Sequence, residues 1–269
     1  MSAAAFADRL AAAVERRRSQ LCLGLDPGAA GGGEVVAECE RLIELAGPAC
    51  VAAKPQLACF ERLGAAGWEA LERVTAAARA AGLLVVADGK RGDVPHTAAA
   101  YAAALVGPDG LGADAVTVNP LLGVDSLDPW VEAAGAAGGG VFLLVRTSNP
   151  GASDLLDLRT DGVPLHERLA EIVAAERRLD GGSGLSGMGA VIGATGAGRL
   201  DRLRALMPRS IFLLPGVGAQ GARASDLGPA LADHPASILV PVSRGISAAP
   251  DPGAAAAALR DELWSLGRG

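Results

Sequence analysis

Eight short apolar runs recur along the chain, and longer stretches rich in alanine, leucine and arginine separate them. Short apolar runs are typical of buried strands, and the stretches between them are long enough to form helices. Strands that alternate with helices form a parallel sheet through right-handed crossovers, so this pattern strongly limits the possible folds. The runs occupy residues 21–25, 50–53, 83–87, 115–118, 141–145, 190–193, 211–214 and 238–242.

Eight strand–helix units are the number that closes a (β/α)8 barrel, and 269 residues are a normal length for one. The alternative is an open, doubly wound sheet, but no G-x-G-x-x-G motif follows the first run, which counts against a Rossmann fold. Residues 1–20 predict an amphipathic helix and not a secretory signal, because the positive charges follow the apolar part. The sequence therefore predicts an α/β protein, a single (β/α)8 TIM barrel domain over residues 1–269 with an extra N-terminal helix.

The composition excludes several classes of function. A formal net charge of -6 leaves no basic surface for nucleic acid, and no apolar run approaches the length of a membrane-spanning helix. The three histidines lack the spacing of metal ligands. The four cysteines form no C-x-x-C pair, as is usual for reduced cysteines in the cytoplasm. We therefore expect a cytoplasmic protein with no metal site and with neither nucleic acid nor membrane as a partner.

The third apolar run ends in the motif Asp88-x-Lys90-x-x-Asp93. Side chains two residues apart in a strand point the same way, so Asp88 and Lys90 share a face at the carboxyl end of the strand. Such a charge cluster is costly to bury unless every member is paired, which suggests a functional site. A purely structural alternative is an ion pair at a strand edge, with Asp93 as a helix N-cap ahead of Pro95.

Lysine usage favours the functional interpretation of this cluster. Of the 24 basic residues, only Lys54 and Lys90 are lysines, and both stand at the ends of apolar runs. An arginine cannot release a proton near neutral pH, whereas a lysine can act as an acid, a base or a nucleophile. Genomic base composition explains the scarcity of lysine but not these positions, so both lysines are candidates for chemistry.

Polar residues follow every predicted strand, as they do at the active rim of a barrel. After the seventh run, Gly216, Gly218 and Gly221 free the backbone to bring amide groups near an anion, and Gln220 adds a side-chain donor. After the eighth run, Arg244 adds a guanidinium. These loops predict a phosphate site, although the glycines alone are also compatible with plain tight turns.

Two further segments have unusual compositions. Residues 149–161 form a long connection, for which we expect a lid or a disordered loop. The glycine-rich residues 180–189 predict a flexible surface turn without a function of its own. Ser148, just before the long connection, has no evident histidine partner, which argues against a serine hydrolase.

Seven motifs together resemble the orotidine 5'-phosphate decarboxylase family, and they cover nearly the whole chain. The motifs KRGD and RTSNPG resemble those of the longer of the two subfamilies. The motifs are LGLDP at 23–27, AKPQ at 53–56, DGKRGD at 88–93 with Thr97, VNPLLG at 118–123, VRTSNPG at 145–151, PGVGAQG at 215–221 and SRGI at 243–246.

The resemblance implies an enzyme without metal or cofactor that converts orotidine 5'-monophosphate to uridine 5'-monophosphate, the last step of de novo UMP biosynthesis. It implies that Lys90 stabilises a carbanion at C6 of the pyrimidine and then protonates it, beside Asp88, which strains the substrate. Asp93 and Thr97 are implied to reach across the interface of a homodimer into the neighbouring site.

The resemblance also implies how the nucleotide binds. Asp26 and Lys54 contact the ribose, and Lys54 joins an alternating chain of charges with Asp88 and Lys90. Ser148 contacts the pyrimidine. The residues implied to hold the phosphate are Gly218, Gln220, Arg244 and Gly245.

Two other functions remain open from the sequence. A magnesium-dependent sugar-phosphate decarboxylase or synthase of the same superfamily shares the Asp-x-Lys-x-x-Asp motif, but it calls for an acidic ligand where this chain has Lys54. A catalytically inactive nucleotide-binding barrel is the second, and the intact Asp88, Lys90 and Asp93 argue against it.

Overall fold

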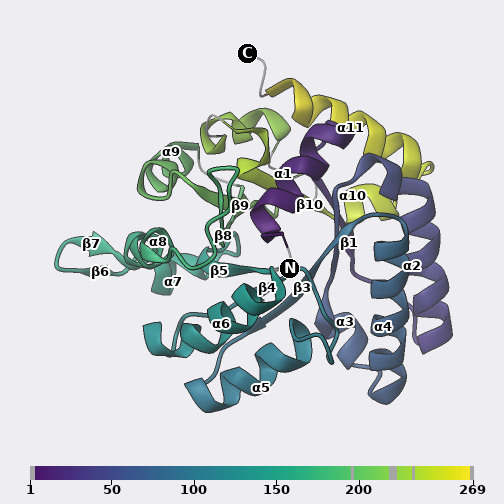
Figure 1. Ribbon diagram of the computed structural model, residues 1–269. Helices are drawn as coiled ribbons and strands as arrows, with labels where there is room; N and C mark the ends of the chain where they lie inside the picture. Colours follow the sequence, from purple (N-terminus) through teal and green to yellow (C-terminus); the bar gives the residue numbers. More distant parts are fainter. Residues whose placement is uncertain (1–3, 195–196, 218–222, 232–233, 267–269) are drawn as a thin grey trace.

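A closed parallel barrel forms the centre of the molecule (Figure 1). The computed structural model describes residues 4–194, 197–217, 223–231 and 234–266. Within these ranges the barrel strands follow the order β1-β10-β9-β8-β5-β4-β3-β2, and each pairs in parallel with its neighbours. This confirms the predicted (β/α)8 barrel. The strands are β1 (Leu21–Leu25), β2 (Ala52–Pro55), β3 (Leu84–Arg91), β4 (Ala115–Val118), β5 (Gly140–Arg146), β8 (Ser186–Ile192), β9 (Ser210–Leu213) and β10 (Ile238–Val242).

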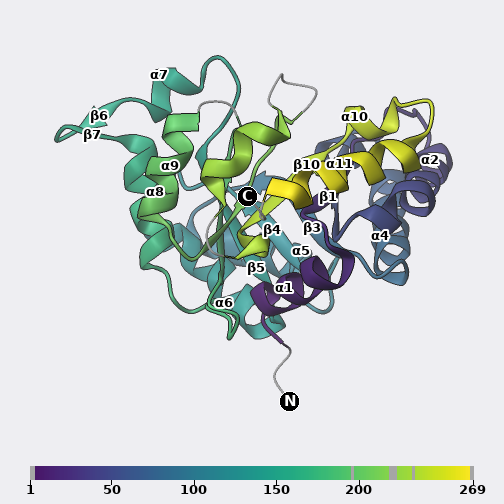
Figure 2. The same cartoon turned by 90° about the horizontal axis from the view of Figure 1, so that it is seen from above.

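Helices surround the barrel, as Figures 1 and 2 show from two directions. Within the described ranges, none of them is long and apolar enough to cross a membrane. The longer helices are α1 (Phe6–Arg17), α2 (Gly32–Ala46), α4 (Ala65–Ala80), α5 (Pro95–Leu105), α6 (Asp128–Ala137), α8 (Leu165–Ala175), α9 (Ala197–Leu206) and α11 (Pro252–Leu266). Shorter elements are α3 (Leu57–Glu61), α7 (Ala152–Leu156), α10 (Arg244–Ser247) and the 3-10 turns η1 (Gly47–Ala49), η2 (Val124–Leu127), η3 (Ala224–Ala230) and η4 (Pro235–Ser237).

The predicted N-terminal helix is confirmed, and α1 lies across one mouth of the barrel (Figure 1). Its apolar face, with Phe6, Leu10 and Val14, is fully buried against side chains from the barrel interior. Phe6 meets Phe142 of β5 edge to face, with ring centroids 5.9 Å apart. This apolar plug leaves the opposite mouth, at the carboxyl ends of the strands, for polar groups.

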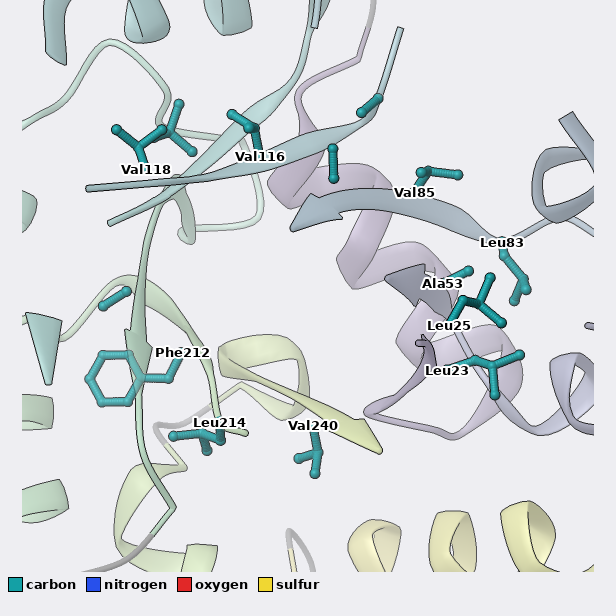
Figure 3. Packing of buried hydrophobic residues seen from close by; sticks show 14 of the residues in the cluster. Leu23, Leu25, Ala53, Leu83, Val85, Val116, Val118, Phe212, Leu214 and Val240 are labelled. Atoms are coloured by element: carbon teal, nitrogen blue, oxygen red, sulfur yellow. The ribbon is translucent and has the colours of Figure 1, made fainter. Parts of the chain in front are cut away.

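The main core lies between the strands and the outer helices (Figure 3). Alternating strand residues face opposite ways, so Leu21, Leu23 and Leu25 of β1 join this layer, while Cys22 faces the barrel interior. The Arg204 guanidinium of α9 stacks 3.6 Å from the ring centroid of Phe212. This packing holds the barrel strands in place, and with them the carboxyl ends at which functional residues of such barrels lie.

Several predicted boundaries were wrong. The second strand is Ala52–Pro55 and not 50–53, so it includes Lys54. The third predicted run ended at residue 87, but strand β3 continues through the charged motif to Arg91. A strand of this length carries Asp88 and Lys90 on ordered backbone.

The two unusual segments are also more ordered than predicted. Residues 149–161 contain helix α7 and one strand of a small antiparallel hairpin, β6 (Arg159–Thr160) with β7 (Val163–Pro164), which projects from the barrel (Figure 1). The glycine-rich 180–189 segment is a surface turn only up to Leu185. Strand β8 begins at Ser186, and its glycines let neighbouring strands approach: a Cβ at Gly189 would lie 2.6 Å from the Ile211 carbonyl oxygen.

Candidate active site

The carboxyl ends of four strands form a polar cavity of about 120 Å³. It brings together Asp26 after β1, Lys54 on β2 and Arg244 after β10, which the sequence placed in one site from three distant loops. Glycine is required at this rim, since a Cβ on Gly24 would lie 2.8 Å from that of Ser243. The cavity is lined by Gly24, Asp26, Lys54, Pro215, Gly216, Val217, Pro241, Val242, Ser243 and Arg244.

Asp88 lies at the centre of the charged cluster and accepts four hydrogen bonds. Its Oδ2 accepts from Lys54 Nζ at 2.5 Å and from Gln56 Nε2 at 3.1 Å. Its Oδ1 accepts from Lys90 Nζ at 2.6 Å and from Thr117 Oγ1 at 2.9 Å. Donors from β2, β3 and β4 and from the residue after β2 therefore hold the carboxylate in one orientation.

The charged groups of this cluster shift one another's pKa. Burial alone raises the pKa of the Asp88 carboxyl, but the ammonium groups of Lys54 and Lys90 outweigh it and hold that pKa well below its usual value. Burial lowers the pKa of Lys54, but Asp88, together with Asp26, more than reverses this and raises it. The cluster is thus a buried carboxylate between two ammonium groups, with the Lys90 side chain partly open to solvent.

A bulge in β3 shapes the cluster. Ala87 pairs with Val116 and Arg91 with Val118, so residues 88–90 lie opposite Thr117 alone. Lys90 has a φ of 47°, in the left-handed region that costs a residue with a side chain about 1–2 kcal/mol. Asp88 and Lys90 do meet as predicted, but through this bulge and not through the simple alternation of a strand.

Asp93 and Thr97 lie just beyond the cluster, where α5 begins. The helix N-cap is Val94, so the structural alternative with Asp93 as the cap does not hold; Asp93 Oδ1 instead accepts a hydrogen bond from Val94 N at 2.8 Å. Pro95 does occupy the first helical turn, as predicted. Both Asp93 and Thr97 are half-buried, and among the described residues no hydrogen bond joins either of them to Lys90.

The remaining predicted residues lie around the same rim. Ser148 follows β5, and Gly193 at the end of β8 approaches it so closely that a Cβ there would lie 2.6 Å from Ser148 Cβ. Arg244 and Gly245 are exposed at the start of α10. Gly218 and Gln220 lie outside the described residues.

The contacts of Gln56, of Thr117 and of a third group of residues were not predicted from the sequence. Gln56 and Thr117 bind Asp88 directly, and neither is charged, so no charge pattern singled them out. The third group anchors the long connection after β5. There Arg146 forms a double hydrogen bond with Asp157 at 2.9 and 3.0 Å, and His166 Nδ1 lies 2.8 Å from the Leu156 carbonyl oxygen.

The cysteines and acidic residues of the described ranges form neither a disulfide nor a metal site. All four cysteines are free thiols, and burial raises the pKa of Cys22 to about 12, which keeps it an unreactive thiol. Within the described ranges, no group of three His, Cys, Asp or Glu residues is arranged to hold a metal ion.

The closed barrel, with a cavity and a charged cluster at the carboxyl ends of its strands, defines an enzyme of the (β/α)8-barrel class. A family model described as the Orotidine 5'-phosphate decarboxylase / HUMPS family matches residues 19–259. The chain belongs to this family, which confirms the predicted resemblance.

Relatives and solved structures agree with this assignment. The orotidine 5'-phosphate decarboxylase of Deinococcus radiodurans is 46% identical over 272 residues, covering 96% of this chain and 96% of that protein. That of Rhodopirellula baltica is 42% identical, covering 90% of this chain and 87% of that protein. The solved structure of Leishmania donovani OMP decarboxylase superposes with a TM-score of 0.88 at 38% identity, covering 98% and 99% of the two chains.

Proposed function

We propose that this chain decarboxylates orotidine 5'-monophosphate to uridine 5'-monophosphate, the last step of de novo UMP biosynthesis, without a metal or cofactor. One observation carries the proposal: the buried Asp88 carboxylate stands between the ammonium groups of Lys54 and Lys90, beside a rim cavity that includes Arg244. The substrate is inferred from the relatives, which are orotidine 5'-phosphate decarboxylases.

The chemistry explains why a lysine stands at this position. Loss of CO2 from C6 leaves an electron pair in the plane of the pyrimidine ring, where no ordinary electron sink is available. The barrier must fall by about 20 kcal/mol, near the upper end of enzymatic effects. The Lys90 ammonium stabilises the developing carbanion and then gives its proton to C6, and the electrons of the broken N–H bond remain on Lys90.

Asp88 acts on the ground state of the substrate. The ammonium groups keep it ionised, so a fixed negative charge faces the position of the substrate carboxylate. Repulsion between the two carboxylates is relieved when CO2 leaves, which favours the transition state. The four donors on Asp88 support this role, because they prevent the carboxylate from turning away.

Binding groups surround this centre. Asp26 and Lys54 contact the ribose hydroxyls, and Ser148 contacts the pyrimidine. The phosphate is remote from the reacting carbon, so its binding energy is available to hold the base in place. The groups proposed to hold it are Gly218, Gln220, Arg244 and Gly245.

We propose a homodimer in which Asp93 and Thr97 complete the neighbouring site. The surface around the start of α5 supports this, because large apolar side chains are exposed there. Val94, the N-cap residue of α5, is 50% exposed, and Val124 of η2, which packs beside α5, is 57% exposed. Exposed apolar groups gathered in this way are typical of interfaces.

A spectrophotometric assay with orotidine 5'-monophosphate tests the proposal. We expect decarboxylation that persists in excess EDTA, because Lys54 occupies the place where the magnesium-dependent branch of the superfamily requires an acidic ligand. Activity that disappears with EDTA and returns with magnesium would move the chain to that branch. No turnover by folded protein would indicate a nucleotide-binding barrel without catalysis.

A further inference from the structure

Thr117 has one hydroxyl that contacts both reactive members of the charged cluster. The side chain is fully buried on β4. Its Oγ1 donates to Asp88 Oδ1 at 2.9 Å and accepts from the backbone N–H of Lys90 at 2.9 Å. A single hydroxyl can fill both roles at once, because it has one proton to donate and lone pairs that accept.

The position of Thr117 in the sheet gives these two bonds their importance. The bulge leaves residues 88–90 opposite this one residue, so regular pairing between β3 and β4 is interrupted there. The threonine hydroxyl replaces the missing backbone acceptor for the Lys90 N–H. That bond holds the backbone of Lys90 at its φ of 47°, a conformation that residues with side chains rarely adopt.

We propose that Thr117 is a positioning residue that fixes where the Lys90 ammonium lies. It acts at both ends of the Lys90–Asp88 contact, since it orients the carboxylate and fixes the backbone from which the lysine extends. The catalytic consequence rests on the proposed function, because it matters to turnover only if Lys90 delivers the proton. The structural consequence, an immobile Lys90, does not depend on any substrate.

The competing explanation is that Thr117 merely fills space in the barrel. Thr117→Val separates the two, because valine has nearly the same shape but lacks the hydroxyl. Thr117→Ser restores the hydroxyl without the methyl group. The chain also offers a matched control: Thr75 on α4 is equally buried, and its hydroxyl has no hydrogen-bond partner among the described residues. Thr75→Val is therefore the same exchange without the two bonds.

Turnover is the first measurement. We expect Thr117→Val to lower kcat roughly 10-fold to 100-fold, since hydrogen bonds to charged groups are the strong ones, while KM stays nearly unchanged. Thr117→Ser should recover most of the loss, and Thr75→Val should behave like the wild type. If the wild type is active, equal kcat in all four proteins, or a Thr117→Ser variant as slow as Thr117→Val, would overturn the proposal.

Lysine labelling is the second measurement and needs no substrate. Because the chain has only Lys54 and Lys90, mass spectrometry can follow acylation of each amine separately. Lys90 must break its contact with Asp88 before it attacks the reagent, so we expect faster labelling of Lys90 in Thr117→Val, but not in Thr117→Ser or Thr75→Val.

The two measurements separate the two proposals. If the wild type does not turn over orotidine 5'-monophosphate but Lys90 labelling still rises in Thr117→Val, the proposed function fails and the positioning role stands. If the wild type is active and Lys90 labelling is the same in all folded variants, Thr117 does not position Lys90. Circular dichroism of each variant establishes that the labelled protein is folded.

Discussion

The two halves of the barrel rim differ in whether their charged groups are paired within the protein. We call the half around β2 to β4, where they are paired, the committed half, and the half after β10, where a charge is unpaired within the part of the chain that the structure describes, the open half. Around β2 to β4, Lys54 and Asp88 are buried and bonded to one another. After β10, Arg244 is exposed, and its guanidinium has no hydrogen-bond or ion-pair partner among the described residues. Folding therefore assembles the first half, whereas the second keeps that unpaired charge, which we propose the nucleotide organises.

This difference corresponds to two physical tasks. Groups that stabilise a transition state are effective only if they are already oriented, because reorganisation during the reaction raises the barrier. Groups that capture a charged ligand can remain in water until binding, which avoids the cost of burying an unpaired charge. Substitutions around β2 to β4 should therefore impair turnover and stability. Substitutions after β10 should mainly weaken substrate binding.

The largest effect should come from Lys90→Arg. The exchange keeps the positive charge, but arginine holds its proton too tightly to deliver it and is too bulky to lie 2.6 Å from Asp88 in the same way. We expect kcat to fall roughly 10³-fold or more in a steady-state assay, because both proton transfer and charge placement are affected.

The reciprocal exchange at the next residue is the matched control. Arg91 pairs with Glu61, and no contact of its side chain with Asp88 is present among the described residues. Arg91→Lys should cost about 0–1 kcal/mol of stability and leave kcat close to that of the wild type. If Lys90→Arg is equally mild, Lys90 is only a structural partner of Asp88.

Asp93 should give the second-largest effect, and it tests whether the committed half of the rim extends across a dimer interface. We expect Asp93→Ala alone to lose roughly 100-fold in kcat through the missing charge. Mixing Asp93→Ala subunits with Lys90→Ala subunits should restore activity in up to half the sites of the heterodimers, because both defects then fall in one site and the other is intact.

Mixed dimers of differently tagged subunits can be purified, which makes the complementation quantitative. If pure heterodimers show no more activity than either parent, Asp93 serves its own subunit's site or only the start of α5. The shared-site proposal would then be wrong, while the roles of Asp88 and Lys90 in their own subunit would be unaffected.

On the phosphate side, Arg244→Ala and Gln220→Ala should mainly raise KM. Each removes one donor from a remote phosphate, and we expect roughly a 10-fold to 100-fold increase in KM with a smaller change in kcat. Arg260→Ala on α11 removes a partly exposed guanidinium that pairs with Asp261 near Arg17 of α1, at the opposite mouth of the barrel, and serves as the control. Unchanged affinity for uridine 5'-monophosphate in both rim variants would contradict the phosphate assignment.

The barrel was predictable from the sequence because the pattern that indicates it repeats eight times along the chain. The buried runs alternate with helices, and chain length and loop polarity agree with that pattern. The contact of Asp88 with Lys90 was also predictable, since both charges stand at the end of one apolar run. Strand ends were less predictable, because a bulge such as the one around Lys90 is a tertiary feature that local propensity does not reveal.

The neutral contacts were the hardest part to predict. Thr117 lies inside an apolar run on a different strand, and only the register of β3 against β4 brings it to Asp88. Gln56 similarly needs the pairing of neighbouring strands to reach the same carboxylate. Single-sequence reasoning finds charges that are costly to bury, but it does not locate the neutral groups that satisfy them.

The smallest effect concerns pH, and it again separates the two halves of the rim. The ammonium groups of Lys54 and Lys90 hold the pKa of Asp88 below its unfolded value, despite the opposing effect of burial. A group with a lowered folded pKa contributes stability that is complete above its unfolded pKa, about 3.9, and is lost as the pH falls below it. Asp88 should therefore make the protein less stable in acid.

Urea unfolding at pH 7 and pH 3 measures this contribution. The wild type should lose about 1 kcal/mol more of its unfolding free energy between these pH values than Asp88→Asn does, because asparagine cannot take up the proton. Arg244→Ala, on the exposed half, should lose as much as the wild type, since it leaves Asp88 between its two lysines. If Asp88→Asn shows the same acid loss as the wild type, the buried carboxylate is not held ionised by its neighbours, and the contrast between a committed and an open half of the rim does not hold.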